Sequence, residues 1–174
     1  EGEDEICDFS LRQRAPLTEL ARQLSDELPQ GIELRSVGPS FDRAKAAARV
    51  EACGYRIELA EPPAVYEDAI DRFNLAAELV LLRRRPKGDK EVDIKKYVEK
   101  VGLAEGGGLV FEMKVTSEGT ARPDEIIEAL SGFAGRELTP IRIVRAQIRL
   151  KEEEQPRAPR HGAPRPGRPR GRRR

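Results

Sequence analysis

The chain has 174 residues, of which 38% are hydrophobic and 36% charged, a length that suits one domain or two small ones. The overall charge of +1 conceals an uneven distribution, because residues 155–174 contain eight arginines and no acid. Residues 1–154 hold 24 basic and 31 acidic residues, and their net charge of −7 argues against a folded body that coats nucleic acid broadly.

The first segment predicts half of a β-α-β unit. Residues 6–11 alternate polar and apolar, as in a half-buried strand, and Pro16 opens a helix over 16–28 with apolar residues three and four apart. Residues 31–37 predict a second strand. We therefore assign residues 1–37 to a partial βαβ unit, and we expect its remainder to precede residue 1.

Residues 38–151 predict a complete α+β domain, and residues 152–174 a disordered Arg/Pro/Gly-rich tail. From residue 54 the order is strand, helix, strand, strand, short helix, strand, helix, strand. This order contains two split β-α-β units, the ferredoxin-like sandwich arrangement. The elements expected after a helix at 41–51 are 54–60, 65–75, 78–85, 90–94, 94–101, 109–115, 123–133 and 141–150.

Two details of these elements carry specific expectations. Proline followed by glycine two residues later, within 85–89, predicts a short hairpin turn. In the last strand the inward-facing set changes phase between Ile143 and Val144, which predicts a β-bulge.

The residue inventory excludes several classes of chemistry from this chain. His161, the one histidine, lies in the tail, so the folded part lacks a catalytic triad and a histidine metal site. Cys7 and Cys53 are too few for an iron–sulfur cluster, and we expect no cofactor or metal in this chain. Neither an apolar run of about 20 residues nor a signal peptide is present, so we expect a cytoplasmic protein without a membrane partner.

The sequence offers no catalytic residues, but it offers candidates for anion or substrate binding. Arg122 precedes Pro123 at the start of a predicted helix, where arginine is a poor N-cap. It either forms a salt bridge with Asp124 or a neighbouring carboxylate, or aims at an anion near free backbone N–H groups. Asp93 and Asp124 are surface acids or ligand-binding groups; an acid/base pair among the carboxylates is the third alternative.

Basic residues supply candidates for nucleic-acid binding. One group surrounds the predicted hairpin turn, and another forms an expected basic outer stripe on the last strand. A solvated charge run that protects a strand edge is the commoner explanation of the hairpin group. The candidates are Arg83, Arg84, Arg85, Lys87, Lys90, Arg145 and Arg149.

Three short motifs resemble the radical-SAM-associated domain of unknown function, a bacterial family, over residues 1 to about 150. They are residues 28–33 (LPQGIE), 90–94 (KEVDI) and 119–125 (GTARPDE), and the opening EGEDEICDFSL resembles the acidic strand in the middle of that domain. The resemblance implies an accessory domain that stands beside, or is fused to, a radical S-adenosylmethionine protein, often near ribonuclease E/G genes. The iron–sulfur cluster and S-adenosylmethionine would belong to that partner. The chain departs from the family pattern by lacking its histidine-containing N-terminal motifs and by its arginine-rich tail.

Three functions therefore compete. The first is a non-catalytic accessory or substrate-handling domain for a radical enzyme, not an enzyme on its own. The second is an RNA-binding module that uses the basic hairpin and tail. The third, a stand-alone hydrolase or transferase with carboxylates at Asp93, Asp124 and Glu125, ranks last because no nucleophile–base pair is visible.

Overall fold

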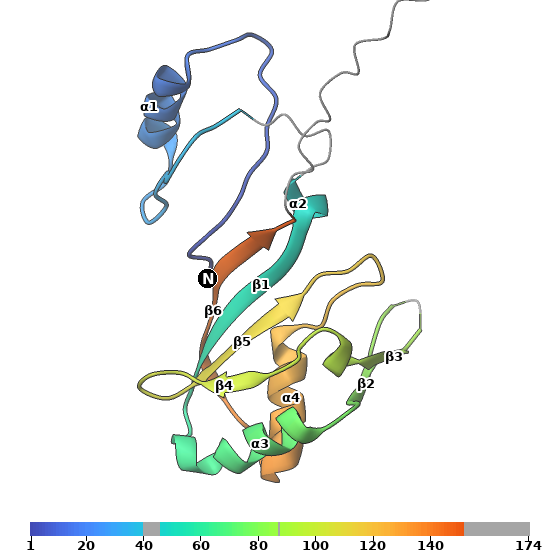
Figure 1. Ribbon diagram of the computed structural model, residues 1–174. Helices are drawn as coiled ribbons and strands as arrows, with labels where there is room; N and C mark the ends of the chain where they lie inside the picture. The colour runs from blue at the N-terminus through green and yellow to red at the C-terminus, as the bar shows by residue number, and fades with distance from the viewer. Residues whose placement is uncertain (40–45, 87, 152–174) are drawn as a thin grey trace, which may run out of the picture.

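The computed structural model describes residues 1–39, 46–86 and 88–151 (Figure 1). The tail predicted at 152–174, Lys87, and the first part of the helix predicted at 41–51 lie outside these residues. The described end of that helix is the single turn α2 (Ala46–Arg49). No helix within the described ranges has both the length and the apolar character that a membrane span requires.

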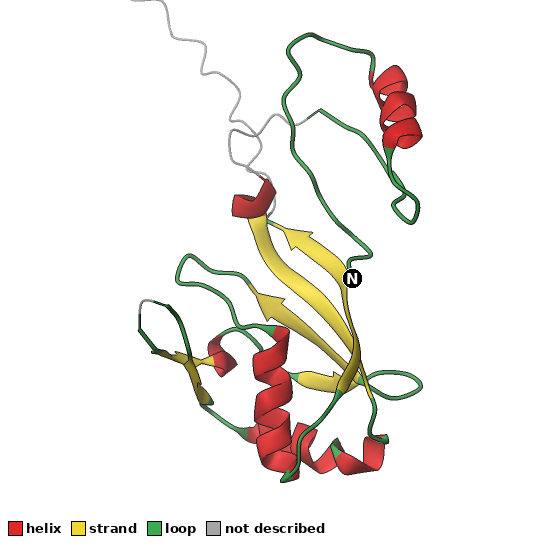
Figure 2. Ribbon diagram, turned by 180° about the vertical axis from the view of Figure 1, so that it is seen from behind, coloured by secondary structure: helices red, strands yellow, loops and turns green. Residues whose placement is uncertain are grey.

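A four-stranded antiparallel sheet forms the body, in the order β4-β5-β1-β6. Its strands are β1 (Val50–Leu59), β4 (Val101–Leu103), β5 (Leu109–Lys114) and β6 (Pro140–Leu150). Helix α3 (Glu67–Leu75) follows β1 and the 3-10 turn η1 (Pro63–Val65), and α4 (Pro123–Ala134) joins β5 to β6. Both helices contribute to one core on the same face of the sheet (Figure 2). The mixed α+β class predicted from the sequence is confirmed.

The predicted hairpin is present but belongs to a separate sheet. Strands β2 (Val80–Arg83) and β3 (Lys90–Asp93) pair only with each other, and the 3-10 turn η2 (Ile94–Lys96) follows. The strand that completes the main sheet is β4, which was not predicted. Its three residues include Gly102 and are too few to show an alternating pattern.

The two strands predicted before residue 38 are wrong. The helix between them is α1 (Leu17–Glu27), as expected, but 6–11 and 31–37 belong to no strand. A strand exists only where a partner satisfies its backbone, and no described segment pairs with either stretch. Alternation of polar and apolar residues indicates that a strand could have one buried face, but it does not indicate whether a partner strand exists. The division of the chain at residue 37 stays a prediction.

Helix α4 shows why the predicted core is largely correct. Pro123 occupies its first turn, Gly135 ends it with φ of 69°, and its apolar residues Ile126, Ile127 and Leu130 are buried. Opposite them, β5 alternates buried and exposed residues throughout, as its sequence predicts. The core residues that are fully buried include Phe73, Ile57, Ile94, Leu109 and Leu138.

The glycine turn between β4 and β5 fixes how closely these strands approach β1. Gly106, Gly107 and Gly108 all have positive φ, which glycine adopts without strain. A Cβ on Gly108 would lie 2.4 Å from the carbonyl oxygen of Ile57, and its N–H donates to the Tyr66 hydroxyl at 2.8 Å. The turn is thus locked against the central strand.

The predicted irregularity in β6 exists, but at different residues. Gly54 faces Gln147 and Tyr55 faces Arg145, so Ala146 is the extra residue, and a second shift leaves Ile141 without a partner. A bulge reverses which residues point to each face of the sheet. This explains the change of phase seen in the sequence.

Candidate functional site

Two of the predicted site residues, Arg83 and Arg122, converge on one buried carboxylate, Glu125. Arg83 reaches it from β2 with Nε and Nη2, each 2.6 Å from a carboxylate oxygen, and Nη2 also donates to the Thr120 carbonyl at 3.0 Å. The Glu125 side chain is 3% exposed and that of Arg83 14%. This two-pronged pair links the hairpin to the start of α4, 42 residues along the chain.

Arg122 completes the cluster at the N-cap of α4. Its backbone N–H donates to Glu125 Oε2 at 2.9 Å, and its guanidinium Nε lies 3.3 Å from Oε1. The guanidinium has no acceptor for a helix N–H, so only the glutamate half of a capping box forms. Arg122 remains half exposed, and Asp124, 3.8 Å away, points to solvent. Arg122 therefore combines both alternatives. Its guanidinium forms salt bridges with carboxylates of α4, and one edge of it stays open to solvent.

The charge state of Glu125 follows from its surroundings. Burial opposes ionisation, but the hydrogen bonds from Arg83 and from the Arg122 backbone outweigh it and hold the pKa of Glu125 below its ordinary value. The same pairing raises the pKa of Arg83. Glu125 is thus charged at neutral pH, and both of its oxygens are occupied, which makes it a poor proton acceptor for a substrate.

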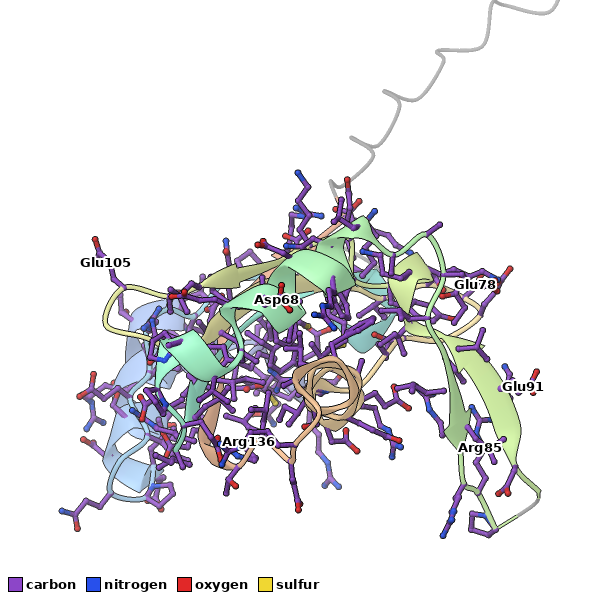
Figure 3. The ribbon with its side chains drawn as sticks, turned by 90° about the horizontal axis from the view of Figure 1, so that it is seen from below. Asp68, Glu78, Arg85, Glu91, Glu105 and Arg136 are labelled. Carbon is purple, nitrogen blue, oxygen red and sulfur yellow. The ribbon has the colours of Figure 1, made fainter. Side chains whose placement is uncertain are left out.

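The other hairpin candidates divide between structural and exposed positions. Arg83 is committed to Glu125, whereas Arg84, Arg85 and Lys90 are exposed, and Lys87 lies outside the described residues. Figure 3 shows Arg85 near the tip of the hairpin, well away from the body. Among the described hairpin candidates, Arg84, Arg85 and Lys90 are therefore the ones accessible to a phosphate.

Asp93 has a local structural role. Its Oδ1 accepts hydrogen bonds from the backbone N–H groups of Leu79, at 3.0 Å, and Lys95, at 3.1 Å. It therefore caps η2 and fixes the base of the hairpin. Among the described residues, no hydrogen bond or ion pair links Asp93 to Arg122 or Asp124, so the three do not form a common site.

The expected basic stripe on β6 is wrong, because the bulge at Ala146 separates its members. Arg145 lies opposite Tyr55, on the face that carries the core, whereas Arg149 lies opposite Ala52 on the other face. Arg149 pairs with Glu51 at 3.1 Å and Glu112 at 2.9 Å.

The sequence analysis missed the partners of the remaining arginines. The first five residues, which we call the acidic strap, lie along β6: Gly2 bridges Arg145, and Glu3 N–H donates to the Arg145 carbonyl at 2.9 Å. The strap's acids pair with three arginines, namely Glu1 with Arg142, Glu3 with Arg56 and Glu5 with Arg145. The signal was available as acids at every second position, 1, 3 and 5, which match arginines of β6 and β1.

Lys95 was also missed. Its ammonium donates to the carbonyls of Phe73, at 3.2 Å, and Glu99, at 2.7 Å, and lies 4.7 Å from the Phe73 ring centre. Burial lowers its pKa. Lys95 thus holds η2 against α3. No group of three potential metal ligands occurs among the described residues.

Comparison with known proteins gives one match. The family model described as "Uncharacterized protein conserved in bacteria (DUF2344)" matches residues 1–124, which include α1, the hairpin, β1, β4, β5 and the Arg122–Asp124 joint. No curated protein and no solved structure matches the chain.

Proposed function

The chain belongs to this family of uncharacterised proteins conserved in bacteria, and from that premise we propose that it is a non-catalytic accessory domain for a radical S-adenosylmethionine protein. The motif resemblance at residues 28–33, 90–94 and 119–125 supports the identity of the partner. In this proposal the partner holds the iron–sulfur cluster and S-adenosylmethionine, and both proteins act in the cytoplasm.

We also propose that the body has the ferredoxin-like arrangement. Helix α3 connects β1 to β4 with β5 between them, and α4 connects β5 to β6 with β1 between them. These are two interleaved split β-α-β units, with the β2–β3 hairpin inserted before β4. Such a sandwich leaves one face of its sheet available to another molecule.

The observation that carries the proposed function is the apolar face of α1. This helix has apolar residues at three- and four-residue spacing, yet none of its residues is buried. Leu17 is 43% exposed, and Leu20, Ala21 and Leu24 are half-buried. Figure 1 shows α1 standing apart from the sheet. A helix gains most of its stability by packing an apolar face, so this face suits a protein partner.

The carboxylates that the hydrolase or transferase alternative would use also support an accessory role. Both oxygens of Glu125 are bonded to arginine, and Oδ1 of Asp93 accepts hydrogen bonds from two backbone N–H groups. Arg122, whose guanidinium keeps an open edge beside a helix N-terminus, would position an anionic group of the substrate for the partner enzyme.

The experiment is co-purification of the full chain with the radical S-adenosylmethionine protein encoded nearest to it. We expect retention by the parent chain and loss for Leu20→Glu combined with Leu24→Glu, because charge on the apolar face opposes its burial. The matched control, Gln23→Glu on the polar face of the same helix, should retain the partner. The proposal is rejected if both variants retain the partner equally, or if neither the variants nor the parent chain retain it.

A basic hairpin supports RNA binding as the second candidate. Arg84, Arg85 and Lys90 are exposed, and no ion pair among the described residues neutralises them. Replacing all three with glutamate in a chain that lacks residues 155–174 should abolish salt-dependent RNA binding, whereas Arg142→Glu should not. If binding disappears with the tail alone, the folded body does not read RNA.

A further inference from the structure

Two parts of the chain have strand character and no strand partner. One is the segment of residues 5–15, which we call the arm. It starts at the last residue of the acidic strap, leads to α1, and is exposed and free of regular structure. Its apolar residues are open to solvent, with Ile6 41%, Phe9 52% and Leu11 48% exposed. Figure 1 shows the arm running away from the main sheet, at the end opposite the β2–β3 hairpin.

The other is the outer edge of β2. Ile94 N–H donates to the Leu79 carbonyl at 2.9 Å, so residues 79, 81 and 83 direct their backbone groups toward β3. Val80 and Leu82 must therefore direct theirs away from β3. These two residues are also 49% and 59% exposed, and within the described ranges nothing pairs with this edge. An exposed apolar strand edge is a template for strand addition.

An apolar hollow of about 460 Å³ accompanies this edge. It lies between the β2 end of the hairpin and α4, and its lining includes Leu79, Leu81, Ala129, Gly132 and Phe133. Figure 3 views α4 along its axis and shows the hairpin projecting beside it. An extended strand on β2 would direct every second side chain into this hollow.

We propose that residues 6–11 of a second copy of this chain add to β2 as an antiparallel strand, and that the two copies exchange arms reciprocally. The match is specific in face and charge. When Ser10 lies opposite Val80, Phe9 and Leu11 fall on the face of Leu81 and Leu79, toward the hollow, and Asp8 falls on the opposite face.

Charge selects the same register. Pairing Ser10 with Val80 brings Arg12 opposite Glu78, and both of these side chains are exposed. Figure 3 shows Glu78 at the base of the hairpin. Parallel pairing would instead run the arm's acidic start toward Glu78. The first residue of the arm, Glu5, stays bound to Arg145 of its own chain. Two identical exchanges close a two-fold dimer and leave no edge open for a third copy.

A charge-exchange experiment tests the pairing by sedimentation velocity at low salt. Arg12→Glu and Glu78→Arg each place like charges opposite one another, so each alone should raise the dimer dissociation constant several-fold. Mixing the two variants should restore the parental constant, because each groove then meets an arm of opposite charge. A parent chain that stays monomeric at all accessible concentrations, or a mixture that associates no better than either variant alone, overturns the proposal.

A cross-link tests the register itself. In a Cys7→Ser background, Ser10→Cys with Val80→Cys should form an intermolecular disulfide on mild oxidation, since Cα atoms of directly opposed residues in a hydrogen-bonded pair lie about 5.5 Å apart. The control combines Ser10→Cys with Leu103→Cys, a comparably exposed site on β4. Equal yields from the two pairs would overturn the assigned register, and the proposal with it.

Discussion

Helices α1 and α4 are nearly equal in length and each has an apolar face, but α1 is the more polar helix and only α4 contributes to the core. The 11 residues of α1 include no buried side chain, whereas five of the 12 residues of α4 are buried. The two helices have different surroundings. Helix α4 packs against α3 and the sheet, whereas α1 lies among the loops of residues 1–39. Amphipathic periodicity predicts that a helix has an apolar face, and the rest of the fold decides whether that face is covered.

The largest expected effect is a difference in core truncation between the two helices. Leu130→Ala removes a fully buried side chain and should lower the free energy of unfolding by about 2–5 kcal/mol. Leu24→Ala on α1 should lower it by less than about 1 kcal/mol, since its site has no surrounding core. Urea denaturation of the full chain measures both values. Equal losses would show that α1 is packed in solution.

Removing one member of the buried ion pair should come next in size. Arg83→Met strands a charged Glu125 at the edge of the core and should cost about 3 kcal/mol, because an unpaired buried charge is costly. Adding Glu125→Leu to this variant should recover part of the loss. The matched control on α1, Arg22→Met, breaks an exposed network with Glu19 and Asp26 and should leave the unfolding midpoint unchanged.

The pH dependence of stability should follow the same contrast. The pKa of Glu125 is lower in the folded chain than its ordinary value of 4.5, so its stabilisation is fully present above pH 4.5. It is lost as the pH falls through the folded pKa. The difference in unfolding free energy between the parent and Glu125→Gln should therefore shrink below pH 4.5. Glu19→Gln on α1, where the carboxylate is exposed, should show little dependence of this kind; a constant Glu125 difference down to pH 2 would contradict the assignment.

The smallest effect concerns the acidic strap. Its ion pairs are exposed and screened by salt, so raising the ionic strength should speed amide hydrogen exchange at Glu3, whose N–H donates to the Arg145 carbonyl. Amides of β5 should not respond. Glu3→Gln with Glu5→Gln should reproduce the salt effect at low salt, and strap exchange that is insensitive to both changes would refute its electrostatic origin.

The sequence predicted those elements whose apolar pattern matches the period of the structure and is long enough to be read. Helix α4 and strand β5 are of this kind, and the hairpin was marked by its turn residues. Strand β4 was lost because three residues carry no periodicity. The strands expected at 6–11 and 31–37 failed because alternation does not reveal whether a partner exists.

The site was predictable in its residues but not in their pairing. Arg122 and Arg83 were both among the candidate binding residues, yet their common partner, Glu125, is three residues from one and 42 from the other. Only the tertiary fold brings them together. The single-residue bulge at Ala146 likewise sends Arg145 and Arg149 to different faces, which no regular period can anticipate.

Gly108 offers a diagnostic that overall similarity does not. Any side chain there would strike the main chain of β1, which cannot swing aside as a flexible side chain would, and Tyr66, 42 positions earlier, grips the same peptide group. In diverged homologues that share little else, a tyrosine at the start of a helix and, at about this separation, a glycine in the turn before a strand should mark descent from the same architecture. Searching genomes with that spaced pair would gather relatives, and their gene neighbours would test the proposed association with a radical S-adenosylmethionine protein.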